Sequence, residues 1–102
     1  MGVPLSYEFR ASLWVWQVRR DLWTFVTLPD DASDEIRART DTGARGFGSV
    51  PVRVRIGSTT WRTSIFPQRA DGPYDLPVKR AVREANALEV GDEPLVFLEV
   101  LG

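Results

Sequence analysis

The chain has 102 residues, of which 43% are hydrophobic and 26% charged, and 13 basic and 14 acidic residues give a formal net charge of −1. This composition predicts one globular domain over residues 1–102, without a transmembrane helix or signal peptide and without a field that would attract nucleic acid or anionic lipid. Because the sequence has no histidine or cysteine, it excludes imidazole bases, cysteine nucleophiles, disulfides and the usual zinc sites.

The N-terminal part of the chain predicts two strands. Residues 7–15 alternate apolar odd positions with polar even positions, which is the period of a half-buried strand. Trp14 and Trp16 break the pattern on the outer face, where an element or a dimer partner covers them or they stack on a ligand. A polar turn at residues 19–21 leads to a second strand, residues 23–28, which is expected to pair back on the first.

The segment after Pro29 predicts a short helix and then a loop. Its four carboxylates favour a helix N-terminus over a metal or acid/base site, so we expect a helix over about residues 32–39 with Ile36 as its apolar anchor. Residues 40–49 contain three glycines but lack the flanking strand and lysine of a phosphate-binding loop. A flap or bulge is expected there, with weak anion binding through Arg45 as the alternative.

The centre of the chain predicts a β-hairpin. A two-residue turn at Gly57-Ser58 sets Ile56 opposite Thr59 and every earlier residue one step further along. Side chains alternate between the two faces of a strand. One face is then apolar, with Val50, Val52, Val54, Ile56, Trp61 and Ile65. The other face carries Arg53, Arg55, Thr60, Arg62 and Ser64.

The predicted pair of Arg53 and Arg62 brings like charges opposite each other, which destabilises a sheet. Either solvent or a carboxylate such as Glu8 or Glu99 neutralises the pair, or the two guanidinium groups form a site for a carboxylate or phosphate ligand. We take as candidate ligand-binding residues Arg45, Arg53, Arg55, Trp61, Arg62 and Ser64.

The C-terminal third predicts a turn, a helix and a final strand. Residues 69–74 contain turn formers, and Asp75 is expected to cap a helix that has Pro77 in its first turn. Its buried face is predicted to hold Val78, Ala81, Val82 and Ala85. The only lysine, Lys79, is expected to be exposed in the first turn, and Asn86 to end the helix. Gly91-Asp92 is then a turn, and residues 95–101 form a central strand.

Two resemblances rest on these residues. The segment 76–83, reading LPVKRAVR, followed by LEVGD at 88–92, resembles the half-motif of the AbrB/MazE swapped-hairpin proteins, and Leu28-Pro29 with residues 50–56 is similar to a degenerate second copy. Over nearly the whole chain, the segments 9–14, 23–29, 46–50, 61–67, 76–79 and 91–92 resemble a bacterial family known only as a domain of unknown function, whose members often precede a YdeI/OmpD-associated segment. The first resemblance implies an internal pseudo-repeat folded as a double-split β-barrel.

These observations predict a mainly β protein with two short helices, cytoplasmic by default, a monomer or homodimer, with no catalytic residue, metal or cofactor. The expected function is non-enzymatic binding of an anionic small molecule or an acidic protein segment on the arginine-bearing sheet face. One alternative is an AbrB-like DNA-binding regulator, although fold analogy and a near-neutral charge give it little support. The other is an enzyme that uses carboxylates or Tyr74 in a barrel pocket.

Overall fold

The computed structural model describes residues 5–18, 21–40, 48–69 and 72–101. Along the chain these residues form β1 (Ser6–Arg10), β2 (Trp14–Val18), β3 (Asp21–Thr27), α1 (Asp30–Thr40), β4 (Val50–Ile56), β5 (Thr59–Pro67), β6 (Tyr74–Pro77), α2 (Arg80–Ala85) and β7 (Leu95–Val100). Neither of the helices in these ranges is long and apolar enough to span a membrane.

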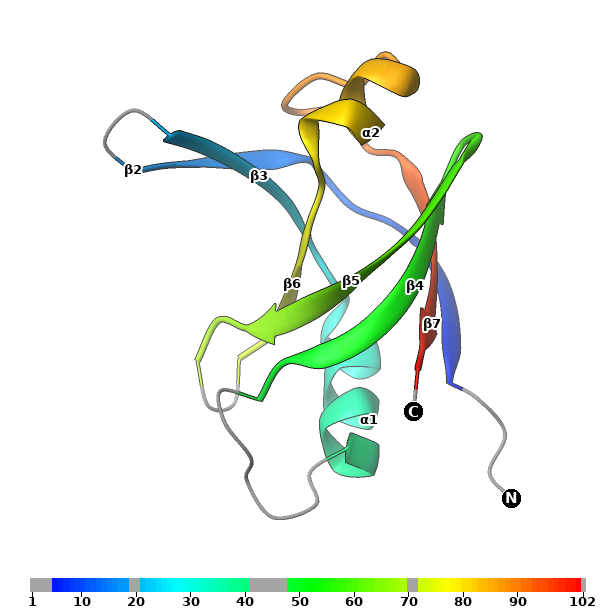
Figure 1. The fold of residues 1–102 in the computed structure, drawn as a ribbon. Helices are drawn as coiled ribbons and strands as arrows, with labels where there is room; N and C mark the ends of the chain where they lie inside the picture. The colour runs from blue at the N-terminus through cyan, green and yellow to red at the C-terminus, as the bar shows by residue number, and fades with distance from the viewer. Residues whose placement is uncertain (1–4, 19–20, 41–47, 70–71, 102) are drawn as a thin grey trace.

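The strands form a single antiparallel sheet in the order β1-β7-β4-β5-β6-β3-β2. The sheet curls into a half-barrel, with α1 near one open end and α2 near the other (Figure 1). In the same view β2 and β3 run out together, away from the other strands. The expectation of a mainly β fold with two short helices is confirmed.

The central hairpin has the register that its sequence predicts. Ile56 lies opposite Thr59 and Val50 opposite Ile65, with Arg53 opposite Arg62 between them. Gly57 adopts a φ of 57° in the turn, in the left-handed region that glycine tolerates best. The four apolar residues of β4 are all buried, while the arginines of the hairpin point to the other face.

The expectation of one strand over residues 7–15 is wrong, because this segment forms two strands at opposite ends of the sheet. β1 pairs with β7, and β2 pairs with β3 as expected for the second strand. Between them Leu13 is buried, and its backbone exchanges two hydrogen bonds of 2.8 Å with Gly91 and Asp92. These two hydrogen bonds hold Leu13 in the link between the strands, so β1 ends before Leu13 and β2 begins after it.

The predicted helix from Asp75 is also wrong in its first half. Residues 74–77 form β6, in which Tyr74 and Leu76 are buried while Asp75 points outward and accepts side-chain hydrogen bonds. α2 begins only after Lys79, which is exposed, and Val82 is its buried residue. Two positions predicted for the buried face, Ala81 and Ala85, are exposed. Asn86 ends the helix as predicted.

α1 begins earlier than predicted, at Asp30. Asp30 and Asp31 lie in its first turn, where they complement the positive end of the helix dipole, and Asp31 accepts a hydrogen bond from the backbone of Ala32. Ile36 is fully buried, as expected. The buried Ser33 hydroxyl accepts a hydrogen bond from the backbone N–H of Tyr74, which ties the helix to β6.

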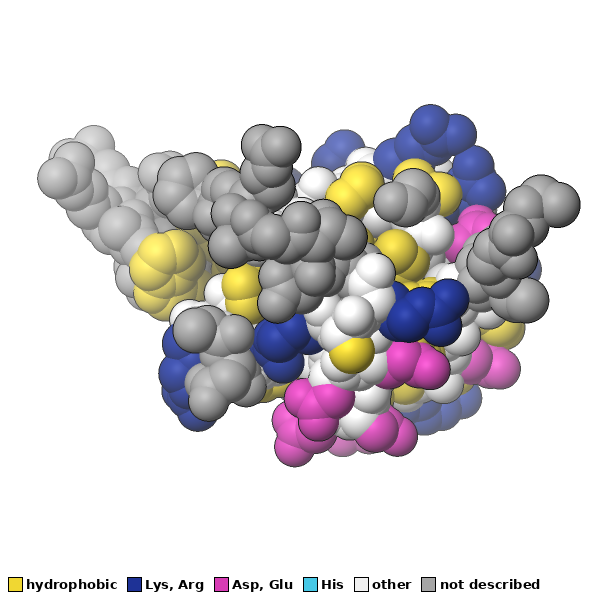
Figure 2. Space-filling view, turned by 90° about the horizontal axis from the view of Figure 1, so that it is seen from below, with side chains coloured by type: hydrophobic (Ala, Val, Ile, Leu, Met, Phe, Trp, Pro, Cys, Tyr) yellow, Lys and Arg dark blue, Asp and Glu magenta, His cyan; other side chains and the backbone are white. Residues whose placement is uncertain are grey.

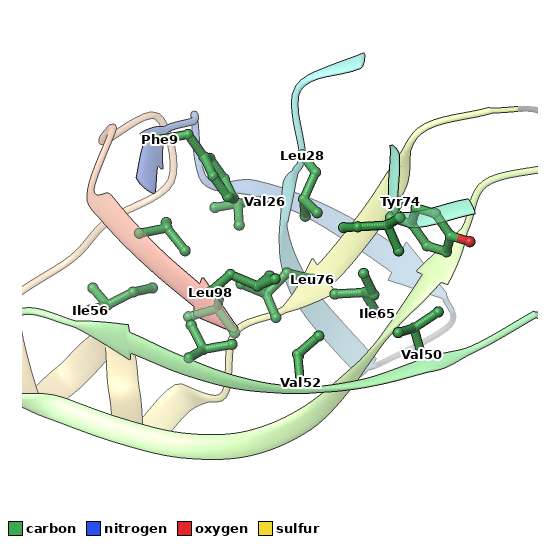
Figure 3. Packing of buried hydrophobic residues seen from close by; sticks show 14 of the residues in the cluster. Phe9, Val26, Leu28, Val50, Val52, Ile56, Ile65, Tyr74, Leu76 and Leu98 are labelled. Carbon is green, nitrogen blue, oxygen red and sulfur yellow. The ribbon is translucent and has the colours of Figure 1, made fainter. Parts of the chain in front are cut away.

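The core fills the concave side of the half-barrel. Its labelled side chains point toward one another from β1, β3, β4, β5, β6 and β7 and from the link between β3 and α1 (Figure 3). They include Phe9, Val26, Leu28, Val50, Val52, Ile56, Ile65, Tyr74, Leu76 and Leu98. Full burial of one such side chain contributes about 1.5–3 kcal/mol. Because the apolar face of the hairpin is used in this way, the arginine-bearing face must point outward.

Candidate functional site

The candidate site is the convex face of four neighbouring strands, β1, β7, β4 and β5. Strand pairing places outward residues in two rows across these strands. The first row is Ser6, Glu99, Arg53 and Arg62, and the second is Glu8, Phe97, Arg55 and Thr60. We call these eight residues the outer arginine face. Its acidic groups lie toward β1 and β7, and its arginines lie on β4 and β5.

Arg53 is neutralised by a neighbouring strand. Its guanidinium donates a 3.0 Å hydrogen bond to a carboxylate oxygen of Glu99, and the two side chains are 43% and 39% exposed. One of the two carboxylates named from the sequence, Glu99, is therefore confirmed as the partner. Arg53 has less capacity than its neighbours for an external anion, because its charge is already compensated.

Arg55 lies over an aromatic ring instead. Its guanidinium carbon is 4.5 Å from the ring centroid of Phe97, a cation–π contact that holds the planar group against the sheet. Both residues line an open groove of about 520 Å³, together with Ser6, Tyr7, Glu8, Arg53, Val54, Thr60, Leu98 and Glu99. In this groove the cation keeps its hydrogen-bond donors free for an acceptor, because a ring face takes none of them.

Arg62 is exposed and, within the described ranges, makes no side-chain hydrogen bond or ion pair. It lies two residues from Thr60 on the same strand face, and Thr60 is directly opposite Arg55. Diagonal neighbours of this kind have Cβ atoms within about 8 Å, which is inside the reach of two arginine side chains. Arg55 and Arg62 can therefore approach one anion together.

Three further predicted residues have different positions. Ser64 lies on the outer side of β5, opposite Pro51 and two residues beyond Arg62 on the same strand face. Trp61 lies opposite Val54 and packs against the core, so the structure separates it from the arginines. Its indole N–H is buried without a hydrogen-bond partner in the described part of the chain. Arg45 lies outside the described residues.

The structure also places a tyrosine beside carboxylates, away from the outer arginine face. The hydroxyl of Tyr7 donates a 2.6 Å hydrogen bond to Glu35 of α1, and Asp31 lines the same small pocket. Burial raises the pKa of the Tyr7 phenol, and the hydrogen bond to Glu35 raises it further. The phenol therefore stays protonated at neutral pH and is a poor base.

The tyrosine proposed for a barrel enzyme, Tyr74, lies in the core. Its side chain is 3% exposed, and the guanidinium of Arg37 lies 5.3 Å from the centre of its ring. Among the described residues no cluster of three acidic side chains is close enough to hold a metal ion. Tyr74 is therefore a core residue of this structure.

The candidate list from the sequence lacked Phe97. Its outward position follows from the alternation of Leu95, Phe97 and Glu99 with the buried Val96 and Leu98. That alternation is present in the sequence but is hidden, because both faces of this strand carry apolar residues. The contact between Phe97 and Arg55 depends on the pairing of β7 with β4, residues far apart along the chain.

The sequence of the chain was compared with known families and proteins. The model of the family described as "Domain of unknown function (DUF1905)" matches residues 9–98. The chain belongs to this family. The whole-chain resemblance to a domain of unknown function is thereby confirmed for this DUF1905 domain, while the family description brings no activity with it. No curated protein matches the chain.

Proposed function

We propose that this DUF1905 domain is a non-enzymatic binding module that holds the carboxylate or phosphate of a small anionic molecule between Arg55 and Arg62. The proposal rests on one observation: the outer arginine face neutralises Arg53 through Glu99 but leaves these two guanidinium groups with free donors. Planar guanidinium groups suit the oxygens of carboxylates and phosphates. An anion that contacts two guanidinium groups is bound more strongly than an anion that contacts one.

The groove beside Arg55 indicates what else the ligand carries. Phe97 offers an aromatic side chain and is 37% exposed, and Thr60 and Ser6 offer hydroxyl groups. Glu8 and Glu99 line the end of the groove nearer β1, so the anionic group of the ligand belongs at the β4 and β5 end. A small anion with a compact polar or aromatic body fits this distribution.

The proposal is tested by thermal denaturation with a panel of phosphorylated sugars, nucleotides and di- and tricarboxylates, at low and moderate salt. A ligand that binds only the folded protein at a hundredfold excess over its Kd stabilises by about 2.7 kcal/mol, which raises Tm by several degrees. We expect one chemical class to raise Tm, and Arg62→Ala and Arg55→Ala to abolish the rise. The matched control is Arg80→Ala, which removes the same charge from the exposed surface of α2.

Three results would contradict the proposal. If the rise survives in Arg55→Ala and Arg62→Ala, the anion binds elsewhere. If no small anion raises Tm but an acidic peptide does, the face binds a protein segment instead. Turnover of any panel member would favour the enzyme alternative.

We also infer that the chain is an internal pseudo-repeat with the double-split barrel arrangement. In support, β3-α1-β4 and β6-α2-β7 have the same element order. A Leu-Pro pair lies directly after β3 and at the end of β6, and β3 pairs with β6 while β4 pairs with β7. This kinship would connect the chain to AbrB-like regulators of bacterial origin. It does not by itself favour DNA binding, because that activity depends on phosphate neutralisation by a basic surface.

A further inference from the structure

The strand β2 ends the sheet and has an open edge. It pairs with β3 on one side, and on its other side no described strand pairs with it. The β2–β3 ribbon also runs out from the half-barrel (Figure 1), so the helices do not cover this edge. A strand in this position presents a row of backbone N–H and C=O groups to whatever approaches.

β2 lacks the features by which proteins usually protect such an edge. Its sequence, WVWQV, contains no charge, proline or glycine. The strand at the opposite end of the sheet, β1, carries Glu8 and Arg10. Trp16 on β2 is 56% exposed, and Val15, on the other face of the strand, is 40% exposed. An apolar, uncharged edge of this kind is a ready template for pairing with another strand.

We propose that β2 pairs with β2 of a second copy of this chain, antiparallel about a two-fold axis, so that two sheets join edge to edge. If the two-fold axis passes at Trp16, this residue lies opposite Trp16 of the second copy. Every other pair of opposed residues along the strand is then also uncharged. A charged partner would find no countercharge in these five residues. Self-pairing leaves no charge unpaired along these five residues, and pairing about a two-fold axis occupies the open edge of both copies, so the assembly stops at two chains.

The size of the contact predicts a reversible dimer. One five-residue strand and the side chains beside it bury much less than the roughly 1,600 Å² of a standard interface. The proposed dimer also leaves the arginine site open, since β6 and β3 separate β2 from β5 in the sheet. Dimer formation and anion binding can therefore succeed or fail independently.

Sedimentation velocity over about a thousandfold range of protein concentration tests the proposal by mass action. We expect the mass to rise with concentration from that of the 11.5 kDa monomer to twice that value and no further. Trp16→Lys sets like charges opposite each other at the axis and should leave a monomer throughout. Phe66→Lys is the matched control, because Phe66 is 45% exposed on β5, which β6 and β3 separate from β2, and it should dimerise like the wild type.

A further variant separates edge pairing from packing of the aromatic faces. Trp23 is 53% exposed but lies on β3, one strand in from the edge, opposite Trp16. Edge pairing predicts that Trp23→Lys still dimerises, whereas face-to-face packing predicts that it does not. If circular dichroism shows that Trp16→Lys is unfolded, Val15→Lys on the same strand replaces it. A monomer at every wild-type concentration, growth beyond a dimer, or a dimer that survives these β2 substitutions would overturn the proposal.

Discussion

Among single residues, Arg62 combines high exposure with an unfavourable neighbour. It lies directly opposite Arg53, whose charge Glu99 compensates from the other side. Opposed like charges cost a sheet up to about 1 kcal/mol. We therefore predict that Arg62→Ala leaves the free energy of unfolding in urea unchanged or raises it by up to about 1 kcal/mol.

Arg80→Ala is the control for this measurement. It removes a surface arginine whose 2.8 Å ion pair with Glu84 is highly exposed, and such a pair is worth about 0.3–0.5 kcal/mol. A loss of stability in Arg62→Ala that is clearly larger than in Arg80→Ala would show that Arg62 has a structural role, against its assignment as a ligand-binding residue.

Tyr7 makes a stability prediction that depends on pH. Because its pKa is raised in the folded protein, the neutral phenol contributes stability that is fully present below the pKa of free tyrosine, about 10, and is lost as pH rises through the folded pKa. Tyr7→Phe removes the hydrogen bond to Glu35 and should cost about 1 kcal/mol at neutral pH.

Urea unfolding of the wild type and Tyr7→Phe at a series of pH values measures this difference. The free-energy gap between the two proteins should be constant through neutral and mildly alkaline pH and should shrink above about pH 10. A gap that stays constant from neutral pH to well above pH 10 would mean that Tyr7 ionises in the folded protein as it does in the unfolded chain, and that the hydrogen bond to Glu35 does not hold its proton.

The tip of the β4–β5 hairpin is held in place by Asn86, at the C-terminal end of α2. The side-chain amide of Asn86 accepts a hydrogen bond from the backbone N–H of Ser58 and donates to the Thr59 hydroxyl and the Val82 carbonyl. A methyl group on Gly57 would overlap the Asn86 side-chain oxygen, and Gly57 has a positive φ. We predict that Gly57→Ala lowers stability by about 2 kcal/mol or more, through backbone strain and a displaced Asn86.

Gly91→Ala separates the two causes. Gly91 also has a positive φ, of 98°, but a methyl group there meets nothing within 4 Å. Its substitution should therefore show the backbone cost alone, about 1 kcal/mol in thermal or urea unfolding. Equal losses at the two glycines would contradict the bracing role of Asn86.

The local sequence pattern was sufficient to predict some strands but not others. The alternation of β4 and β5 and the turn glycine fixed the whole hairpin register, because every step of that inference lies within 16 consecutive residues. The strand β6 was missed because Pro77 and the following apolar positions also fit the first turn of a helix. Its strand conformation depends on pairing with the distant β3 at residues 25–27.

At the scale of the whole molecule, the sequence predicted half of the candidate site. The arginines of the outer arginine face follow from the hairpin, but Phe97 and the position of Glu99 beside Arg53 depend on β7 entering between β1 and β4. That strand order is set by how all seven strands close the core, which single-strand periodicity does not contain. The same limit explains why residues 7–15 looked like one strand, since only tertiary contacts at Leu13 divide them.

The overall charge makes a prediction about nucleic acid. The net charge is −1, and the face seen in Figure 2 carries both basic and acidic side chains with neither sign dominating the described residues. Non-specific DNA affinity comes from neutralised phosphates. We therefore predict no saturable change in fluorescence anisotropy of labelled duplex DNA at physiological salt. Binding that is strong at low salt and falls steeply with added salt would instead favour the AbrB-like alternative.

The most direct test of the proposed anion site is an NMR titration that follows the guanidinium Nε–Hε signals with inorganic pyrophosphate as the probe. The predicted result is a saturable shift of the Arg55 and Arg62 signals, a smaller change for Arg53, whose charge Glu99 already compensates, and none for Arg80 on the surface of α2. Small, linear shifts of equal size at all four arginines, or no saturable shift at Arg55 and Arg62, would contradict an anion site on the outer arginine face.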